Sequence, residues 1–376
     1  MTDETNNQDE PESWRGPRPR PGILDIEAYK GGASSIDGHD RVIKLSSNES
    51  ALGPSPKAVQ AFEEAKAKLP LYPDGSAFKL RQAIGDHYGL SADRIVCGAG
   101  SDEILHLLVQ AFAGPGDEVL YSQHGFLVYK IAAMANGATP VAAPEKDNRA
   151  DVDALLARVN ARTRILFIAN PNNPTGTYLR IDELKRLHAA LPEHVLLVID
   201  AAYAEFVRQN DYEAGIEIVS GAHSAVMTRT FSKIYGLAGL RLGWAYCPQR
   251  IADVINRIRG PFNISEAAQA AGIAALRDTS YTERAIAHND AWLPWLNDRI
   301  RKAGLKTTPS VGNFILIHFP DTRGKRAADA DVWLKRNGII TRKVDAYGFP
   351  NALRVSVGRE EENRAVVAAL EEFMAQ

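Results

Sequence analysis

The stretch "HVLLVIDAA", residues 194–202, decides the fold class. An unbroken run of branched apolar residues leads into Asp200, and this pattern is typical of a strand buried on both faces. Similar runs separated by helix-like segments occur at 93–98, 117–122, 163–170 and 225–231. Strands that alternate with helices predict right-handed crossovers and a mostly parallel sheet covered by helices.

The pattern changes after about residue 261. Long helices are predicted first, then short strands that could form a small sheet, and finally a helix that closes the chain. These segments are 264–278, 280–304, 313–319, 338–344, 352–358 and 362–376. The sequence therefore predicts an α/β fold with a large α/β domain and a smaller α+β domain. The expected divisions are a disordered or extended tail (1–27), a segment packing on the small domain (28–54), the large domain (55–262) and the small domain (263–376).

Composition excludes several classes of protein. Of the 376 residues 24% are charged, and the net charge of −2 gives no basic excess for nucleic acid. No apolar run approaches the ~18 residues of a membrane span, and the acidic N-terminus lacks the features of a secretory signal. The two cysteines indicate reduced thiols, and the nine histidines show no metal-ligand spacing. We expect a cytoplasmic protein without a metal site.

Polar residues that follow the apolar runs are the first candidates for a site, because ligands bind at the carboxyl ends of parallel strands. In "GAGSDE" (98–103), Ser101 and Asp102 begin a helix and could face a phosphate, although they could equally be an ordinary N-cap. In "NPNNPTG" (170–176) a rigid turn presents Asn173, for which simple turn chemistry is the alternative. Asp200 needs a cation or hydrogen-bond donors if it is buried, or else it caps a turn. Tyr203 is close enough to share its pocket.

The stretch "TRTFSKIYGLAGLRLG", residues 228–243, places one lysine among apolar residues and glycines. Burial and a neighbouring cation both lower the pKa of an amine, which makes Lys233 a nucleophile for carbonyl groups. Arg241 can supply that cation and hold an anion, while Thr230 and Ser232 add hydroxyl donors.

Together these residues match one cofactor, pyridoxal phosphate. It offers an aldehyde for a lysine, a ring nitrogen for a carboxylate, a phenolic oxygen for Tyr or Asn, and a phosphate for a helix N-terminus, hydroxyls and arginine. Each piece is weak alone, but each lies at the end of a successive predicted strand.

The chain resembles the fold-type I pyridoxal-phosphate aminotransferases and, within them, the histidinol-phosphate aminotransferases. The motifs span nearly the whole chain beyond the tail: "LDIEAYKGG", "IKLSSNESALGPSP", "LYPDGS", "GAGSDEIL", "NPNNPTGT", "VIDAAYAEF", "TRTFSKIYGLAGLRLG", "GNFILI" and "LRVSVG". The resemblance implies a mostly parallel seven-stranded sheet in the large domain.

The resemblance also implies roles for the cofactor site. Lys233 would attach the cofactor and then move a proton between the substrate carbon and C4′ of the cofactor, while Asp200 would keep the pyridine nitrogen protonated. Asn173 and Tyr203 would hydrogen-bond the phenolic oxygen. The residues expected to hold the phosphate are Ser101, Asp102, Thr230, Ser232, Arg241 and, from a second copy of the chain in a homodimer, Tyr72.

At the substrate end, the resemblance implies that Arg354 binds the carboxylate of the amino donor or the phosphate of histidinol phosphate. Arg342 and Tyr29 would assist at this anionic end, and Asn48 lies in the N-terminal substrate segment. Three positions depart from the family pattern: Ala201 replaces a common Glu, Phe126 replaces the tyrosine over the cofactor ring, and Gly31-Gly32 replaces Pro-Gly. None touches the lysine, the aspartate or the arginines, but Phe126 bears on substrate choice.

The resemblance leaves several functions open. The first is transamination between histidinol phosphate and 2-oxoglutarate, which gives imidazole-acetol phosphate and glutamate. The second is an aromatic amino-acid aminotransferase for phenylalanine or tyrosine, alone or as a second activity. Decarboxylation of an amino-acid phosphate is a weaker alternative. A non-catalytic cofactor-binding regulator is also weaker, because such a regulator usually carries a DNA-binding domain and the short acidic tail leaves no room for one.

Overall fold

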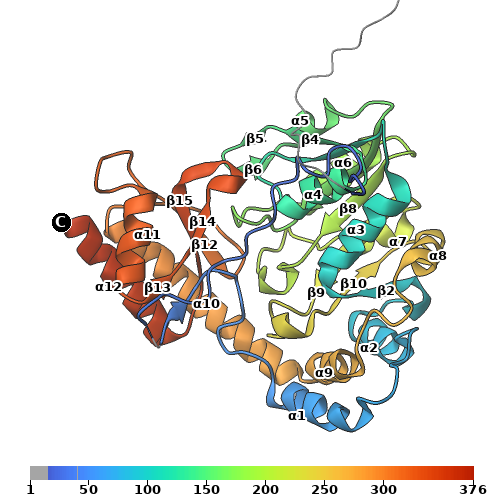
Figure 1. Ribbon diagram of the computed structural model, residues 1–376, viewed down its shortest axis with the longest axis horizontal. Helices are drawn as coiled ribbons and strands as arrows, with labels where there is room; N and C mark the ends of the chain where they lie inside the picture. The colour runs from blue at the N-terminus through green and yellow to red at the C-terminus, as the bar shows by residue number, and fades with distance from the viewer. Residues whose placement is uncertain (1–15, 40) are drawn as a thin grey trace, which may run out of the picture.

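The computed structural model describes residues 16–39 and 41–376, and residues 1–15 of the predicted tail lie outside them. A large domain built on a seven-stranded sheet lies beside a smaller domain (Figure 1). The strand order is β2-β10-β9-β8-β7-β3-β4, and only β10 runs antiparallel to its neighbours. The strands are β2 (Ile95–Gly98), β3 (Glu118–Ser122), β4 (Thr139–Ala143), β7 (Thr163–Ala169), β8 (Leu196–Asp200), β9 (Ala225–Thr230) and β10 (Gly243–Tyr246). The predicted α/β fold with a mostly parallel seven-stranded sheet is confirmed.

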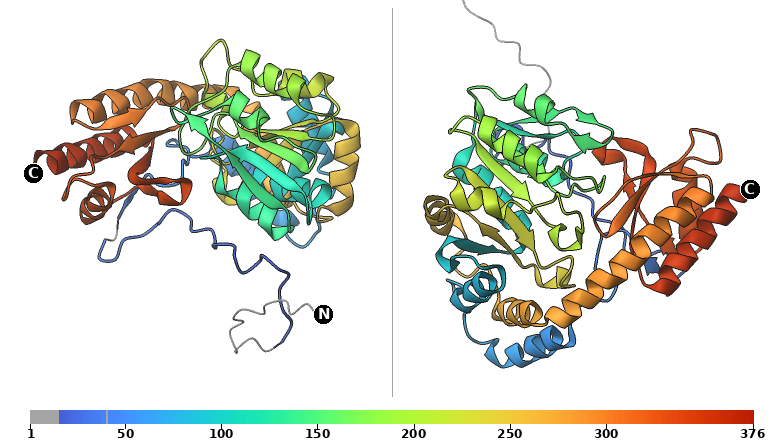
Figure 2. Two further views of the ribbon diagram at one scale, coloured as in Figure 1. Left: turned by 90° about the horizontal axis from the view of Figure 1, so that it is seen from above. Right: turned by 180° about the vertical axis from the view of Figure 1, so that it is seen from behind.

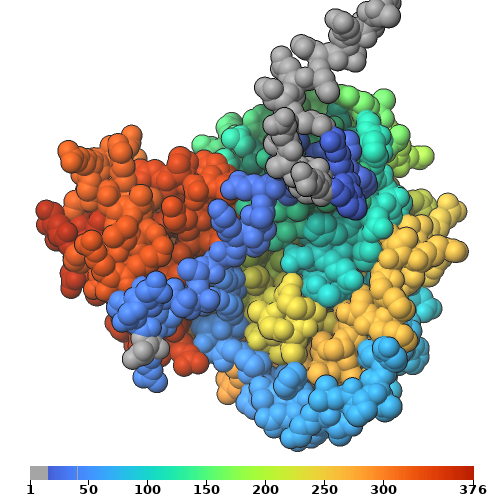
Figure 3. Space-filling view, viewed as in Figure 1, coloured from blue at the N-terminus to red at the C-terminus, as the bar shows by residue number. Residues whose placement is uncertain are grey.

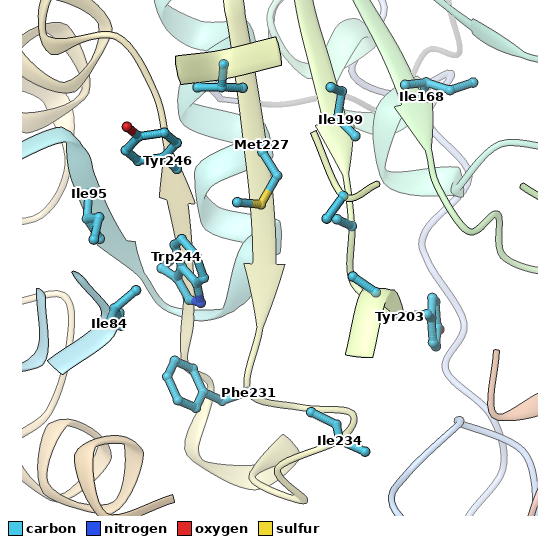
Figure 4. Packing of buried hydrophobic residues seen from close by; sticks show 14 of the residues in the cluster. Ile84, Ile95, Ile168, Ile199, Tyr203, Met227, Phe231, Ile234, Trp244 and Tyr246 are labelled. Atoms are coloured by element: carbon cyan, nitrogen blue, oxygen red, sulfur yellow. The ribbon is translucent and has the colours of Figure 1, made fainter. Parts of the chain in front are cut away.

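Helices cover both faces of this sheet, which explains the unbroken apolar runs of its central strands. One face packs against α3 (Gly100–Phe112), α4 (Leu127–Ala135) and α8 (Gln249–Ile258). The helices of the other face are α1 (Pro56–Ala65), α2 (Phe78–Tyr88), α5 (Val152–Leu156), α6 (Ile181–Ala190), α7 (Ile216–Gly221) and α9 (Glu266–Arg277). Figure 4 shows this second core, in which Trp244, Met227 and Ile199 project from adjacent strands. A short hairpin, β5 (Glu145–Lys146) and β6 (Arg149–Ala150), lies beside the sheet.

The small domain is a four-stranded antiparallel sheet packed on helices. Its strand order is β11-β12-β15-β14, with bounds Lys306–Thr308, Phe314–His318, Phe349–Ser356 and Arg342–Val344. The helices are α10 (Thr279–Lys302), α11 (Ala327–Arg336) and α12 (Glu360–Ala375). The predicted single strand at 338–344 is divided, because β13 (Ile339–Ile340) pairs with β1 (Ile43–Lys44) while β14 pairs with β15.

The structure differs from the predicted domain boundary at 262/263. Helix α9 packs against α1 and α2, and its Ala268, Ala271 and Leu276 belong to the core of the large domain. Helix α10 then runs from α9 to the small domain (Figure 2). An apolar helical face does not reveal its partner from spacing alone, so the prediction assigned α9 to the wrong domain.

The N-terminal segment joins the two domains. Arg20 donates to the carbonyl of Ala135 at the end of α4 in the large domain, whereas β1 pairs with β13 of the small domain. In the space-filling view this segment crosses the junction between the domains (Figure 3). Within residues 16–39 and 41–376, no helix is long and apolar enough to span a membrane.

Candidate active site

A cavity of about 250 Å³ lies at the carboxyl ends of β7, β8 and β9, under the N-terminal segment. It collects every predicted site residue except Tyr72, from both domains. The predicted residues that line it are Tyr29, Asn48, Ser101, Asp102, Phe126, Asn173, Asp200, Tyr203, Thr230, Ser232, Lys233, Arg241, Arg342 and Arg354.

Lys233 lies in the loop that follows β9, and its amine points into this cavity. Its Nζ donates to the backbone carbonyl of Ser47 at 3.0 Å and lies 5.7 Å from the centre of the Tyr203 ring. Burial, together with the nearby Arg354 guanidinium, lowers the pKa of Lys233 to about 8. About a tenth of this amine is therefore neutral and nucleophilic at pH 7, far more than for an ordinary lysine.

Asp200 ends β8 and is buried beneath the cavity. Its Oδ2 accepts a hydrogen bond from the Tyr129 hydroxyl at 2.9 Å, and its Oδ1 accepts one from Thr228 at 3.2 Å. Burial raises the pKa of Asp200 to about 6 despite these bonds. Within the described residues no ion pair joins this carboxylate, so a cationic group arriving from the cavity would meet an uncompensated acceptor.

One end of the cavity is built for an anion. Helix α3 begins there with Gly100 and Ser101, and the first N–H groups of a helix attract negative charge. Arg241 donates to the Ser232 hydroxyl at 3.3 Å, while the Thr230 hydroxyl donates to Ser232 at 3.0 Å.

Close backbone packing shapes this end. Gly100 has φ +78°, and a Cβ there would overlap Nη2 of Arg241. A Cβ on Gly243 would overlap the backbone nitrogen of Ser101. Only glycine lets the start of α3 and the Arg241 side chain come this close. The Asp102 carboxylate is turned to Arg241 Nη2 at 3.1 Å, so its backbone N–H, not its side chain, is what it can offer an anion.

The small domain also brings positive charge to the cavity, through Arg342 of β14 and Arg354 of β15. Arg354 is buried on β15, where it donates to Oδ1 of Asn173 and, at 2.8 Å, to the carbonyl of Ser46. Its Nε is a buried donor that finds no hydrogen-bond partner among the described residues. Arg342 lies over the Tyr29 ring at 5.7 Å. Burial lowers the pKa of Arg354, which favours an anionic partner for it.

A buried hydrogen-bond chain holds the middle of the cavity. Nδ2 of Asn48 donates to the Tyr203 hydroxyl at 2.9 Å, and Ser356 donates to Oδ1 of Asn48 at 3.1 Å. Asn48 has φ 54°, a conformation that asparagine tolerates better than most residues. These hydrogen bonds link Asn48 of the N-terminal segment to Tyr203 of the large domain and Ser356 of the small domain.

The sequence comparisons agree with this geometry. Residues 40–370 match the family described as aminotransferase class I and II. The chain belongs to the class I and II aminotransferases. Two relatives named histidinol-phosphate aminotransferase, from Paramagnetospirillum magneticum and Nitrobacter hamburgensis, are 59% and 54% identical over 358 and 361 residues. These matches cover 95% and 96% of this chain and 99% of each relative.

Solved structures show the same architecture. The crystal structure of histidinol-phosphate aminotransferase from Sinorhizobium meliloti in complex with pyridoxal-5'-phosphate has a TM-score of 0.85 and 28% identity, and covers 96% of this chain and 98% of that chain. An aromatic aminotransferase from Pyrococcus horikoshii, at 23% identity and a TM-score of 0.78 over 88% of this chain and 95% of that chain, shares the fold.

Tyr72 is the one predicted site residue of this aminotransferase that lies away from the cavity. It is 82% exposed and stacks on Phe262 with ring centres 4.6 Å apart. Phe126 does line the cavity, and its ring is perpendicular to that of Tyr129, with ring centres 6.0 Å apart. Arg229, the other arginine of the 228–243 stretch, pairs with buried Glu205 at 2.8 Å.

Sequence reasoning missed three groups of this aminotransferase that contact the predicted residues: the carbonyl of Ser47, Thr228 and Tyr129. A backbone carbonyl carries no sequence signal. Thr228 precedes Thr230 by two residues, so the two side chains lie on the same face of β9. Tyr129 follows Phe126 by three residues, which is about one helical turn. Helical spacing from Phe126 was the signal that could have identified Tyr129.

Proposed function

We propose that this aminotransferase uses pyridoxal 5'-phosphate to convert histidinol phosphate and 2-oxoglutarate into imidazole-acetol phosphate and glutamate, a step of histidine biosynthesis. The observation that carries the proposal is a single cavity that brings together the Lys233 amine and two guanidinium groups, those of Arg241 and Arg354. Near-full-length identity of 59% to a relative named histidinol-phosphate aminotransferase supports the same substrate.

The residues fit the cofactor. Buried Asp200 has donors on both oxygens but no ion pair among the described residues, which suits a protonated pyridine nitrogen. The glycine-lined start of α3 with Arg241 suits the phosphate. When bound, the cofactor supplies an aldehyde for amines and a ring that accepts electrons. The residues we assign to hold it are Ser101, Asp102 (through its N–H), Phe126, Asn173, Asp200, Tyr203, Thr230, Ser232, Lys233 and Arg241.

The side chains of this chain divide the chemical work. Lys233 would hold the cofactor through its amine and, as a free base, would accept the proton from the amine-bearing carbon of the substrate. Its pKa near 8 places it close to the range in which a base both exists in its free form and accepts a proton. Asp200 would hold the proton on the ring nitrogen, and Tyr203 would donate to the phenolic oxygen.

Substrate binding is assigned to the Arg354 end. The amino donor in one direction carries a phosphate and in the other a carboxylate, and a guanidinium binds both with two parallel hydrogen bonds. Arg354 is already anchored by Ser46 and Asn173, so its orientation is fixed before substrate arrives. Arg342, Tyr29 and Asn48 complete this end.

A homodimer is part of the proposal. Tyr72 is exposed among other exposed apolar side chains, Leu69, Leu71 and Phe262, on one surface of the large domain. A contiguous exposed apolar surface is typical of a protein interface. We assign Tyr72 to the phosphate end of the cavity in a second copy of the chain.

The substrate proposal is tested by mixing the cofactor-loaded enzyme with histidinol phosphate and, separately, with phenylalanine, while the absorbance of the lysine-bound cofactor is followed. Rapid conversion by histidinol phosphate supports it, and Arg354→Lys should slow that conversion whereas exposed Arg364→Lys should not. Conversion by phenylalanine but not by histidinol phosphate would establish the aromatic alternative instead.

A further inference from the structure

The hydroxyl of Tyr129 reaches Asp200 from outside the cavity. Tyr129 is completely buried in α4, and its hydroxyl lies 2.9 Å from Oδ2 of Asp200. Its ring stacks on Phe167 of β7 with centres 4.6 Å apart and an interplanar angle of 2°. The position of this hydroxyl is therefore fixed by packing on both the helix and the sheet.

Tyr129 contacts two parts of the cavity wall at once. Its ring packs at right angles to that of Phe126, which lines the cavity, while its hydroxyl holds the carboxylate that ends β8. Thr228 holds the other oxygen of that carboxylate. With one donor on each oxygen, the Asp200 carboxylate cannot rotate without breaking a buried hydrogen bond.

We infer that Tyr129 is a positioning residue: its hydroxyl orients Asp200 toward the cofactor's ring nitrogen. The inference rests on the proposed cofactor. Tyr129 touches neither cofactor nor substrate in this arrangement; it acts through the carboxylate. Burial keeps the pKa of Tyr129 well above its ordinary value, so the hydroxyl remains a donor throughout the working range of pH.

The test compares how wild-type protein and the Tyr129→Phe variant each bind two ligands. Full-length protein freed of cofactor is titrated with pyridoxal phosphate and with its carbocyclic analogue, in which C–H replaces the ring nitrogen. Tyr129→Phe keeps the ring packing against Phe126 and Phe167 and removes only the hydroxyl. We expect it to weaken pyridoxal phosphate about tenfold, as loss of a hydrogen bond to a charged group does, and to leave the analogue unchanged.

Matched variants separate positioning from packing. Tyr121→Phe removes a hydroxyl from a buried ring 6.3 Å from Tyr129 and should change neither affinity. Thr228→Val removes the other donor and should show the same preference for the analogue, which keeps the inference testable if Tyr129→Phe folds poorly. Equal loss of both ligands, or no loss of either, would overturn it. A wild-type protein that binds neither ligand would refute the cofactor itself.

Discussion

Gly100→Ala is expected to weaken binding of the cofactor phosphate by displacing one group, the Arg241 guanidinium. A side chain at φ +78° costs about 1–2 kcal/mol in backbone strain. The new methyl would also overlap Nη2 of Arg241 and lie 3.2 Å from its Cζ, so the guanidinium must move away. Loss of one charge-assisted hydrogen bond weakens binding by about 1.5–3 kcal/mol, or roughly ten- to a hundredfold.

The assay is titration of cofactor-free protein with pyridoxal phosphate, accompanied by thermal unfolding. Alanine substitutions at two other glycines separate the effect of backbone strain from that of the displaced guanidinium. Gly116 has φ +91° and open space around it, so Gly116→Ala carries the strain alone. Gly239 is close to Arg241 in the chain, has open space and no unusual φ, so Gly239→Ala carries neither cost. A Gly100→Ala protein that binds the cofactor as tightly as these two controls would refute the reasoning.

Other predictions follow from groups around the cavity. Arg229→Met leaves Glu205 buried without its partner 2.8 Å away, and should destabilise the fold by about 3–5 kcal/mol in chemical denaturation while the folded protein still binds cofactor; unchanged stability would contradict the role of this pair. Lys233→Met should stabilise the cofactor-free protein below pH 8. There the wild-type fold carries the cost of a buried ammonium, because the folded pKa is about 8 against 10.5 for the unfolded chain. The difference in melting temperature should shrink as the pH rises from 8 to 10.5, and a difference independent of pH would contradict the assigned burial.

The sequence predicted the parts of the fold whose signal is local. The apolar runs ending in Gly98, Ala169, Asp200 and Thr230 identified strands covered on both faces. Strand β4 was not predicted. It lies at the edge of the sheet and is half exposed, so it lacks the continuous apolar run of the central strands. Helix α9 was recognised, but its partner was not, since packing partners are set by the whole fold.

The candidate site likewise divides into residues with a local sequence signal and residues that only the fold brings together. Lys233 and Asp200 stood out because a charged residue in an apolar setting requires a reason. Helical spacing from Phe126 could have drawn attention to Tyr129, but only the folded structure shows that its hydroxyl reaches Asp200. Tyr72 remains apart from the cavity in a single chain, and its assigned role depends on a second copy.

The most direct test of the central claim is borohydride reduction of the cofactor-loaded protein, followed by peptide mapping by mass spectrometry. Reduction converts a lysine–cofactor link into a stable amine. We predict a single modified peptide with the cofactor on Lys233, and no modification in Lys233→Ala. Cofactor fixed to another lysine, or fixed equally in the Lys233→Ala protein, would contradict the assignment of this cavity.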